Sequence, residues 1–188
     1  MADQRFIYRL TLKEDDNGTI LVTSPDLEGL ATYGADEADA KAKAIDAIRA
    51  LVSHLMEEGR DVPQPGRPRK GEPTVTLPTL LAGKLALYRA MRATGVTQRG
   101  LAKLLRIDER QVRRLLDPLN ASRFDEIDAA LHALGQRPEL VIHNVSLHEF
   151  AGPRLHDSGG MIGRPVRRFH VIPTMGSTEA RAKKAPRK

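Results

Sequence analysis

The chain has 188 residues, of which 40% are apolar and 29% are charged, and its formal net charge is +6. This length allows one ordinary domain or two small ones, and the apolar content suffices for a packed core, which argues against a wholly disordered chain. The absence of cysteine excludes a disulfide framework, a thiolate zinc site and a cysteine nucleophile. No apolar run approaches the ~20 residues that span a bilayer, and residues 1–5 do not resemble a signal peptide, so we expect a cytoplasmic protein without a membrane partner.

Charge is distributed unevenly along the chain. Residues 1–58 carry 6 basic and 12 acidic side chains, whereas residues 79–147 carry 11 and 7, and residues 148–188 carry 9 and 3. An acidic front and a basic back indicate two modules with different partners, a basic one for the first module and nucleic acid for the second. Solvated faces of different sign would produce the same numbers.

The first predicted elements are β-strands. Apolar side chains alternate over residues 6–12, which predicts a strand, and the turn sequence at 15–18 precedes a returning strand over residues 19–23. A loop at 24–29 leads to a short third strand around residues 30–33.

A helix follows, with Asp36 as its predicted N-cap and Gly59 as its stop. Its apolar face is predicted to consist of residues at helical spacing, which are Ala38, Ala42, Ile45, Ile48, Val52 and Leu55. Residues 60–73 are rich in proline, and residues 74–77 have strand propensity. The proline-rich segment is therefore either a linker or, if 74–77 join the sheet, a loop inside a first domain spanning 1–78.

Residues 79–147 have a helical pattern throughout. We predict a helix from 79 to about Gly95, a second from Gln98 to Leu105 capped by Thr97, and a third from Asp108 to Leu116. Ser122 is predicted to cap a fourth helix that stops at Gly135, and residues 140–143 form a possible strand. Residues 148–188 are expected to be a disordered basic tail. The fold class is thus α+β, with a β-β-β-α-β domain at 1–78 and an all-α domain at 79–147.

Residues 97–116 have the internal pattern of a helix-turn-helix. Leu101, Ala102 and Leu105 would pack inward, with Ile107, Val112 and Leu115 closing the pair. Outward arginine and glutamate side chains on the second helix would then pair with base edges in the major groove, and polar residues at the first helix N-terminus would meet a phosphate. The predicted DNA-binding residues are Gln98, Arg99, Glu109, Arg110, Arg113 and Arg114. An arginine-rich solvated helix in a bundle has the same apolar spacing.

Other candidate sites are weaker. Asp26 and Glu28, in the predicted loop, are candidates for contacts with a basic partner, while residues 66–70 resemble the Arg-Pro hooks that enter A·T minor grooves. A basic proline loop is the simpler interpretation of the latter. No two histidines lie three or four residues apart, and the predicted strands carry no carboxylates, so we expect neither a metal site nor catalysis, and no cofactor.

Two stretches of the chain resemble the HicB antitoxins of bacterial HicA–HicB toxin–antitoxin pairs, in the form with a helix-turn-helix domain. The sequence SPDLEG at 24–29, followed by TYG at 32–34 and DEA at 36–38, resembles the family segment PDLPG…G…EA. The second stretch runs from VTLP at 75–78 through KLALYRAM at 84–91 and the predicted helix-turn-helix to ALHALG at 130–135.

The resemblance implies a division of labour. In the family, an N-terminal partial RNase H-like or double-stranded-RNA-binding-like domain binds and occludes HicA, a small basic RNase that cleaves mRNA. The C-terminal domain dimerises and binds the operator of its own operon. By match to the family pattern, Gln98 falls at the phosphate-contacting position, and Glu109, Arg110, Arg113 and Arg114 fall on the base-reading face.

Two positions depart from the family pattern. Arg106 stands in the turn where the family usually has glycine, and it would be strained if its φ angle is positive. Arg113 stands where many relatives carry serine, so the operator sequence cannot be transferred. The tail after His148 has no counterpart in the resemblance.

These observations predict a non-enzymatic antitoxin and autorepressor whose partners are a HicA-like toxin, operator double-stranded DNA and further copies of itself. One alternative is a stand-alone helix-turn-helix transcription regulator with a ligand-sensing N-terminal domain. The other is a metal-dependent nuclease.

Overall fold

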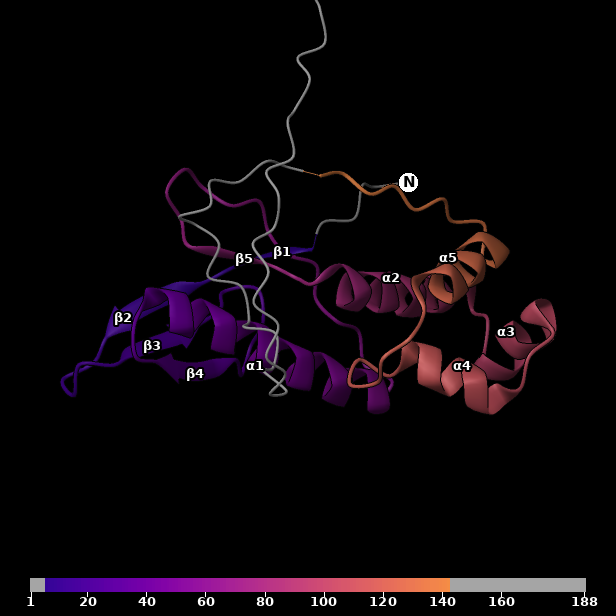
Figure 1. Ribbon diagram of the computed structural model, residues 1–188, viewed down its shortest axis with the longest axis horizontal. Helices are drawn as coiled ribbons and strands as arrows, with labels where there is room; N and C mark the ends of the chain where they lie inside the picture. Colours follow the sequence, from indigo (N-terminus) through magenta and orange to yellow (C-terminus); the bar gives the residue numbers. More distant parts are fainter. Residues whose placement is uncertain (1–5, 143–188) are drawn as a thin grey trace, which may run out of the picture. The chain divides into compact units, whose positions relative to one another are not determined.

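The computed structural model describes residues 6–142, all of which belong to one compact unit. As predicted, the fold is α+β: within these residues four short strands are followed by a long helix, a fifth strand and four more helices (Figure 1). The predicted tail at 148–188 and His143 of the predicted last strand lie outside the described residues.

The first four strands are β1 (Ile7–Arg9), β2 (Thr11–Glu14), β3 (Ile20–Thr23) and β4 (Ala31–Gly34). Strands β2, β3 and β4 form an antiparallel sheet in that order, with Val22 opposite both Leu12 and Thr32. The strand predicted over residues 6–12 is interrupted at Leu10, whose N–H group donates to the carbonyl oxygen of Pro73 at 2.8 Å. The chain therefore changes its pairing partner at this buried residue.

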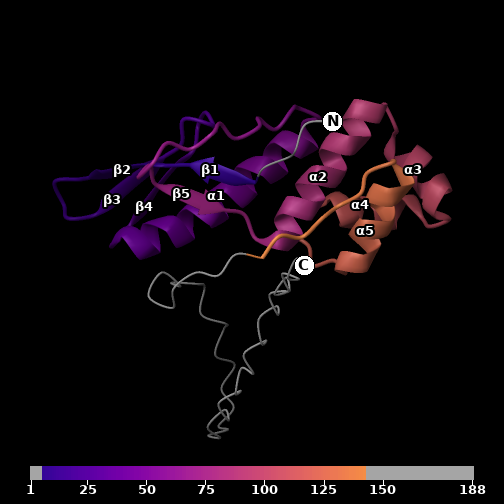
Figure 2. The ribbon, with the colours of Figure 1, turned by 90° about the horizontal axis from the view of Figure 1, so that it is seen from above.

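Strand β5 (Thr74–Thr76) pairs antiparallel with β1, with Val75 opposite Tyr8 (Figure 2). Residues 60–73 thus connect α1 to a strand that returns to the N-terminal part of the chain. Of the two interpretations open from the sequence, the proline-rich segment is a loop within the sheet-bearing part rather than a linker.

Helix α1 (Glu37–Glu57) begins at its predicted cap, where Asp36 Oδ1 accepts a hydrogen bond from the N–H group of Asp39 at 2.8 Å. Its buried apolar face consists of Ala40, Ala44, Ile48, Val52 and Leu55. The predicted face was wrong in its first turns, because Ala38 is exposed and Ala42 is only half-buried. The reason is the close approach of β4: a Cβ atom on Gly34 would lie 2.3 Å from the backbone nitrogen of Ala40, so the helix meets the sheet through Ala40.

The remaining helices are α2 (Thr79–Thr94), α3 (Gln98–Leu105), α4 (Glu109–Leu116) and α5 (Phe124–Ala133). The first three agree with the prediction within one residue. The predicted cap of the last helix is wrong: α5 begins at Phe124 after Arg123, and the Ser122 hydroxyl group instead accepts a hydrogen bond from the buried Lys84. Residues 140–142 are exposed and form no strand in the described chain.

Helix α2 is tied to the N-terminal part of the chain by three side chains. The Tyr88 hydroxyl group donates to the carbonyl oxygen of Arg60 at 2.7 Å, and Arg89 Nη2 donates to that of Pro63 at 2.8 Å. Arg92 Nε donates to Asp61 Oδ1 at 2.5 Å. Helix α2 therefore connects the sheet-bearing part of the chain with the other helices. Among the described residues, no helix is both long enough and apolar enough to cross a membrane.

Candidate functional site

Helices α3 and α4 form a tight pair, and the N-terminus of each helix is capped by a nearby side chain. Thr97 Oγ1 accepts a hydrogen bond from the N–H group of Gly100 at 3.1 Å and caps α3 as predicted. Before α4, the N–H group of Asp108 donates to Gln111 Oε1 at 3.0 Å. Fully buried Leu101 and Val112 hold the two helices to the rest of the helical part. These caps and contacts define where each helix begins and which face it exposes.

The turn between the two helices is strained. Arg106 has φ 56° and ψ 43°, and it is the one non-glycine residue with positive φ among the described residues. A side chain in this left-handed region costs roughly 1–2 kcal/mol. Arg106 therefore has the backbone strain that a positive φ angle was expected to cause.

The exposed face of α4 carries charged side chains that have no ion-pair partner in the part of the chain that the structure describes. Its outward arginines are neighbours on the helix surface, because Arg113 and Arg114 follow Arg110 by three and by four residues, about one helical turn. All the predicted DNA-binding side chains are exposed, and none forms a hydrogen bond or an ion pair within the described residues: Gln98, Arg99, Glu109, Arg110, Arg113 and Arg114. Like charges at this helical spacing destabilise an isolated helix by a few tenths of a kcal/mol per pair. The arginines therefore form an exposed cationic surface on α4.

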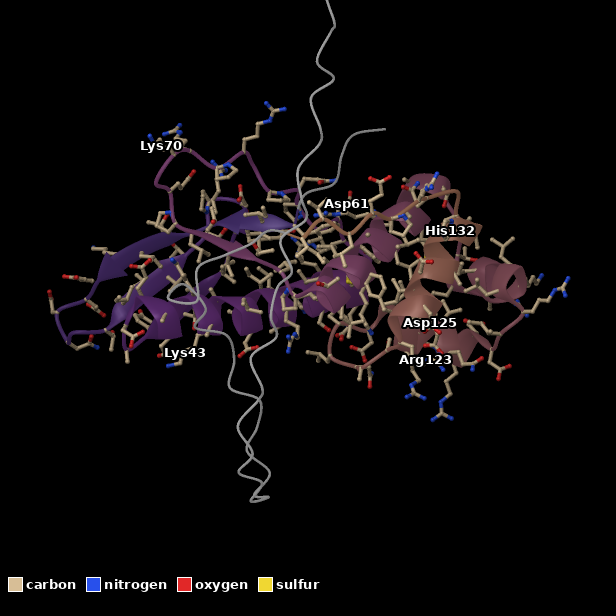
Figure 3. All side chains as sticks on the ribbon, turned by 45° about the horizontal axis from the view of Figure 1, so that its top comes forward. Lys43, Asp61, Lys70, Arg123, Asp125 and His132 are labelled. Atoms are coloured by element: carbon tan, nitrogen blue, oxygen red, sulfur yellow. The ribbon has the colours of Figure 1, made fainter. Side chains whose placement is uncertain are left out.

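Arg123, just before α5, provides a contrast. Its Nη2 atom lies 2.7 Å from Asp125 Oδ2, and the two side chains lie together in Figure 3. Its charge is thus compensated within the chain, whereas the arginines of α4 form no ion pair within residues 6–142.

The end of α4 is held from inside the protein by Lys84 of α2, which is fully buried. Its ammonium group donates to the carbonyl oxygens of Arg114 at 3.1 Å and Asp117 at 2.7 Å, and to Ser122 Oγ at 2.7 Å. Burial lowers the pKa of Lys84 below its usual value, and the nearby carboxylates of Asp117 and Glu126 oppose this shift.

This contact supplies donors to the last carbonyl groups of α4, which have no partner within the helix. The predictions missed the buried contact that Lys84 makes with the end of α4. The available signal was a lysine inside the otherwise apolar pattern of residues 80–91.

Asp26, predicted to contact a basic partner, is used within the chain. Its side chain is 2% exposed, and its oxygens accept from the backbone N–H group and Nε of Arg9 at 2.9 and 3.0 Å and from the N–H group of Gly66 at 3.0 Å. Burial by itself would raise the pKa of the Asp26 carboxyl group, but the hydrogen bonds from Arg9 and Gly66 outweigh it and hold the pKa below its usual value. Asp26 therefore fastens the loop at 24–29 to β1 and to the proline-rich loop.

Glu28, which was also predicted to contact a basic partner, is placed differently from Asp26. It is exposed and forms no ion pair within the described residues. The structure thus separates a carboxylate that organises the loop from one that faces solvent.

The proline-rich loop carries four exposed basic residues, Arg60, Arg67, Arg69 and Lys70, the last of which is labelled in Figure 3. The N–H group of Arg69 donates to Glu72 Oε2 at 2.7 Å, which closes the turn. Across residues 6–142, no three histidine, aspartate or glutamate side chains gather in a way that could hold a metal ion.

Comparison with known proteins identifies the family of the chain. Residues 7–86 match the model of a family described as the HicB-like antitoxin of bacterial toxin–antitoxin systems. Antitoxin HicB 2 of Photorhabdus laumondii is 31% identical over 134 residues, which cover 71% of this chain and 94% of that protein. Antitoxin HicB of Pseudomonas fluorescens is 28% identical over 70% of this chain and 90% of its own length, and Antitoxin HicB of Escherichia coli K12 is 26% identical over 72% and 98%. The chain therefore belongs to the HicB family of antitoxins of bacterial toxin–antitoxin systems.

Proposed function

We propose that this chain is a cytoplasmic, non-enzymatic antitoxin that neutralises a HicA-like mRNA-cleaving toxin and represses its own operon. Membership of the HicB family supports the first half of the proposal. The unpaired arginine face of α4 is the observation that carries the second half.

For operator binding, we infer that α3 and α4 act as a helix-turn-helix with α4 in the major groove of duplex DNA. Guanine O6 and N7 can accept hydrogen bonds from the guanidinium groups of Arg110, Arg113 and Arg114, and cytosine N4 can donate one to the Glu109 carboxylate. Gln98 and Arg99 at the start of α3 are suited to the phosphate backbone. Two such chains related by a two-fold axis would meet half-sites one helical turn apart, so the repressor is proposed to be a homodimer or a higher oligomer through residues 79–147.

For toxin binding, we infer that β1–β5 and α1 form the family's partial RNase H-like or double-stranded-RNA-binding-like domain and cover the toxin. The supporting observation is the negative charge of residues 1–58, which carry 12 acidic and 6 basic side chains. Such a surface favours encounter with a basic protein. Glu28 remains a proposed toxin contact, while Asp26 acts indirectly by shaping the loop.

Gel shifts on the promoter upstream of this chain's own gene test the repressor half. Arg110→Ala and Arg114→Ala should each weaken operator binding by roughly tenfold and relax specificity at one position. Arg123→Ala, which removes an arginine already paired with Asp125, is the matched control and should bind within twofold of the parent. If both α4 variants bind as the parent does with the same salt dependence, α4 is not the recognition helix.

The second candidate is a ligand-sensing regulator, and a shallow surface groove of about 510 Å³ is a space that a ligand would occupy. Its lining includes Met56 of α1, Tyr88 and Met91 of α2, and Gln98 at the start of α3. The two functions differ in their partner. Copurification of the parent chain with the HicA-like product of the adjacent gene supports the antitoxin, whereas the lack of such a gene together with ligand-dependent operator binding supports the regulator.

A further inference from the structure

One face of the β2–β3–β4 sheet is left open by the rest of the described chain. Helix α1 packs against β3 and β4 and covers the face that carries Val22 and Gly34 (Figure 1). Because side chains alternate along a strand, the neighbouring row of the sheet, formed by Lys13, Leu21 and Tyr33, points to the opposite face. We call this row, together with Thr23 of β3, the open sheet face.

The open sheet face has the chemistry of a protein-binding surface. Tyr33 is 50% exposed, and its hydroxyl group forms no hydrogen bond within the described residues. Leu21 beside it is only half-buried and is not part of the core. Tyrosine is enriched at protein interfaces because it buries a large apolar area and keeps a polar group for the partner.

The charge around this face selects the kind of partner. Between Leu10 and Ala40 the sequence has eight acidic residues and one basic residue, Lys13. Glu14 pairs with Ile20, and Ile20 pairs with Gly34, so the turn after β2 and the start of α1 lie at the same end of the sheet. Of the acidic residues at that end, the following are exposed and form no ion pair within the described residues: Glu14, Asp15, Asp16 and Asp36.

This charge argues against two other occupants. A nucleic acid would be repelled by the acidic rim, and so would the same face of a second copy of this chain. A basic protein surface with an apolar centre is complementary in both charge and polarity.

We propose that the open sheet face, centred on Tyr33 and Leu21 and adjoining the acidic turn at Asp15 and Asp16, is the surface that binds the toxin. This inference rests on the proposed antitoxin function and adds the site of contact. The toxin is therefore expected to present a cationic surface that surrounds an apolar contact, with Tyr33 at the centre of the interface.

Binding of the purified full chain to the HicA-like product of the adjacent gene, followed by calorimetry, tests the proposal. Tyr33→Thr, which keeps strand propensity, should weaken toxin binding at least tenfold. The matched control is Leu119→Ala, because Leu119 is also a large exposed apolar residue, 65% accessible, between α4 and α5. It should change the affinity by less than twofold.

A charge reversal provides a second measurement, which tests the electrostatic part of the proposal rather than the apolar contact. Asp16→Lys should lower the association rate several-fold at low salt, and this loss should diminish as salt is raised. Glu139→Lys, an exposed acidic residue beyond α5, should leave the rate unchanged. Circular dichroism of each variant checks that the fold is retained.

The outcomes separate the site from the function. If the parent binds the toxin and Tyr33→Thr binds it equally well, the open sheet face is not the contact, although the antitoxin function stands. If the parent does not bind the toxin at all, the proposed function fails with it. If Tyr33→Thr instead dissociates a homodimer or weakens DNA binding, the face belongs to another partner and the proposal is overturned.

Discussion

At the scale of single residues, two charged side chains that folding withdraws from solvent organise the two halves of the chain. Asp26 joins the loop before β4 to Arg9 and to Gly66 of the proline-rich loop. Lys84 joins α2 to the end of α4. A buried charge is tolerated only where hydrogen bonds replace its hydration, so both residues are expected to be sensitive to substitution.

Asp26→Asn should lower the free energy of unfolding at pH 7 by about 2 kcal/mol, since it removes a charge-assisted acceptor from Arg9 and Gly66. The pKa of Asp26 is lowered in the folded state, so its stabilisation is complete above the usual aspartate pKa and is lost as the pH falls through the folded-state pKa. Urea denaturation at pH 7 and at about pH 3 measures both effects, and the gap between parent and variant should narrow in acid.

Asp46→Asn is the control for this pair of measurements. Asp46 is 77% exposed and lies 3.7 Å from Arg49 on α1. An exposed ion pair of this kind contributes about 0.5 kcal/mol or less. If the difference in the free energy of unfolding between the parent and Asp26→Asn stays constant with pH, the charge of Asp26 does not have the assigned role.

Arg106→Gly should raise the free energy of unfolding by about 1 kcal/mol, because glycine adopts positive φ without the clash that a Cβ atom causes. The same change inside a helix, Arg110→Gly, should lower the free energy of unfolding by about 1 kcal/mol. Thermal denaturation of the two variants beside the parent provides the comparison. Loss of stability in both variants would show that the Arg106 side chain makes a contribution larger than its backbone strain.

At the scale of elements, the candidate recognition helix is short and depends on its surroundings. Helix α4 spans eight residues, too few to be stable alone in water. It is held by the capping interaction at Asp108, by buried Val112 and by the contact of Lys84 with its last carbonyl groups. Its orientation toward a partner therefore depends on the contact with α2 as well as on the α4 sequence.

Lys84→Met should lower the free energy of unfolding by about 2 kcal/mol, because the carbonyl oxygens of Arg114 and Asp117 would lose their donor while the apolar volume is kept. Hydrogen exchange should show the largest increase in the last turn of α4. Lys103→Met, on the exposed side of α3, should change stability by less than about 0.5 kcal/mol. Equal effects of the two substitutions would argue against a specific role for Lys84.

At the scale of the whole described chain, the acidic sheet-bearing part and the basic helices are joined along α2. Tyr88, Arg89 and Arg92 bind the chain segment that follows α1, and Arg89 also lies over the Phe6 ring, with 5.6 Å from its Cζ atom to the ring centre. The sheet-bearing part also includes β5, which runs directly into α2. The two proposed binding functions are thus carried by elements that share packing, rather than by domains on a flexible tether.

Much of the secondary structure follows from local sequence. The caps at Asp36 and Thr97, the bounds of α3 and the inward side chains Leu101 and Val112 agree with the prediction. These features depend on hydrogen bonds and periodicities within a few residues, which the sequence displays directly. The exposure of the α4 arginines follows for the same reason.

The predictions were wrong or incomplete where distant residues meet. Ala40, and not Ala38, leads the buried face of α1 because Gly34 admits the helix backbone. Ser122 was predicted as a cap, but it accepts a hydrogen bond from Lys84, 38 residues earlier in the chain. For Asp26, the local sequence did not show that Gly66, 40 residues away, donates to its carboxylate.

Local patterns in the amino-acid order specified the α+β class, most helix and strand positions and the resemblance to the HicB family, because each of these is encoded in short or regularly spaced segments. The path of the backbone through space determined which carboxylate is neutralised by Arg9, which lysine holds α4 and which face of the β2–β3–β4 sheet remains open. These properties depend on packing between segments far apart in the chain, and the free energy of such contacts exists only once the chain has folded.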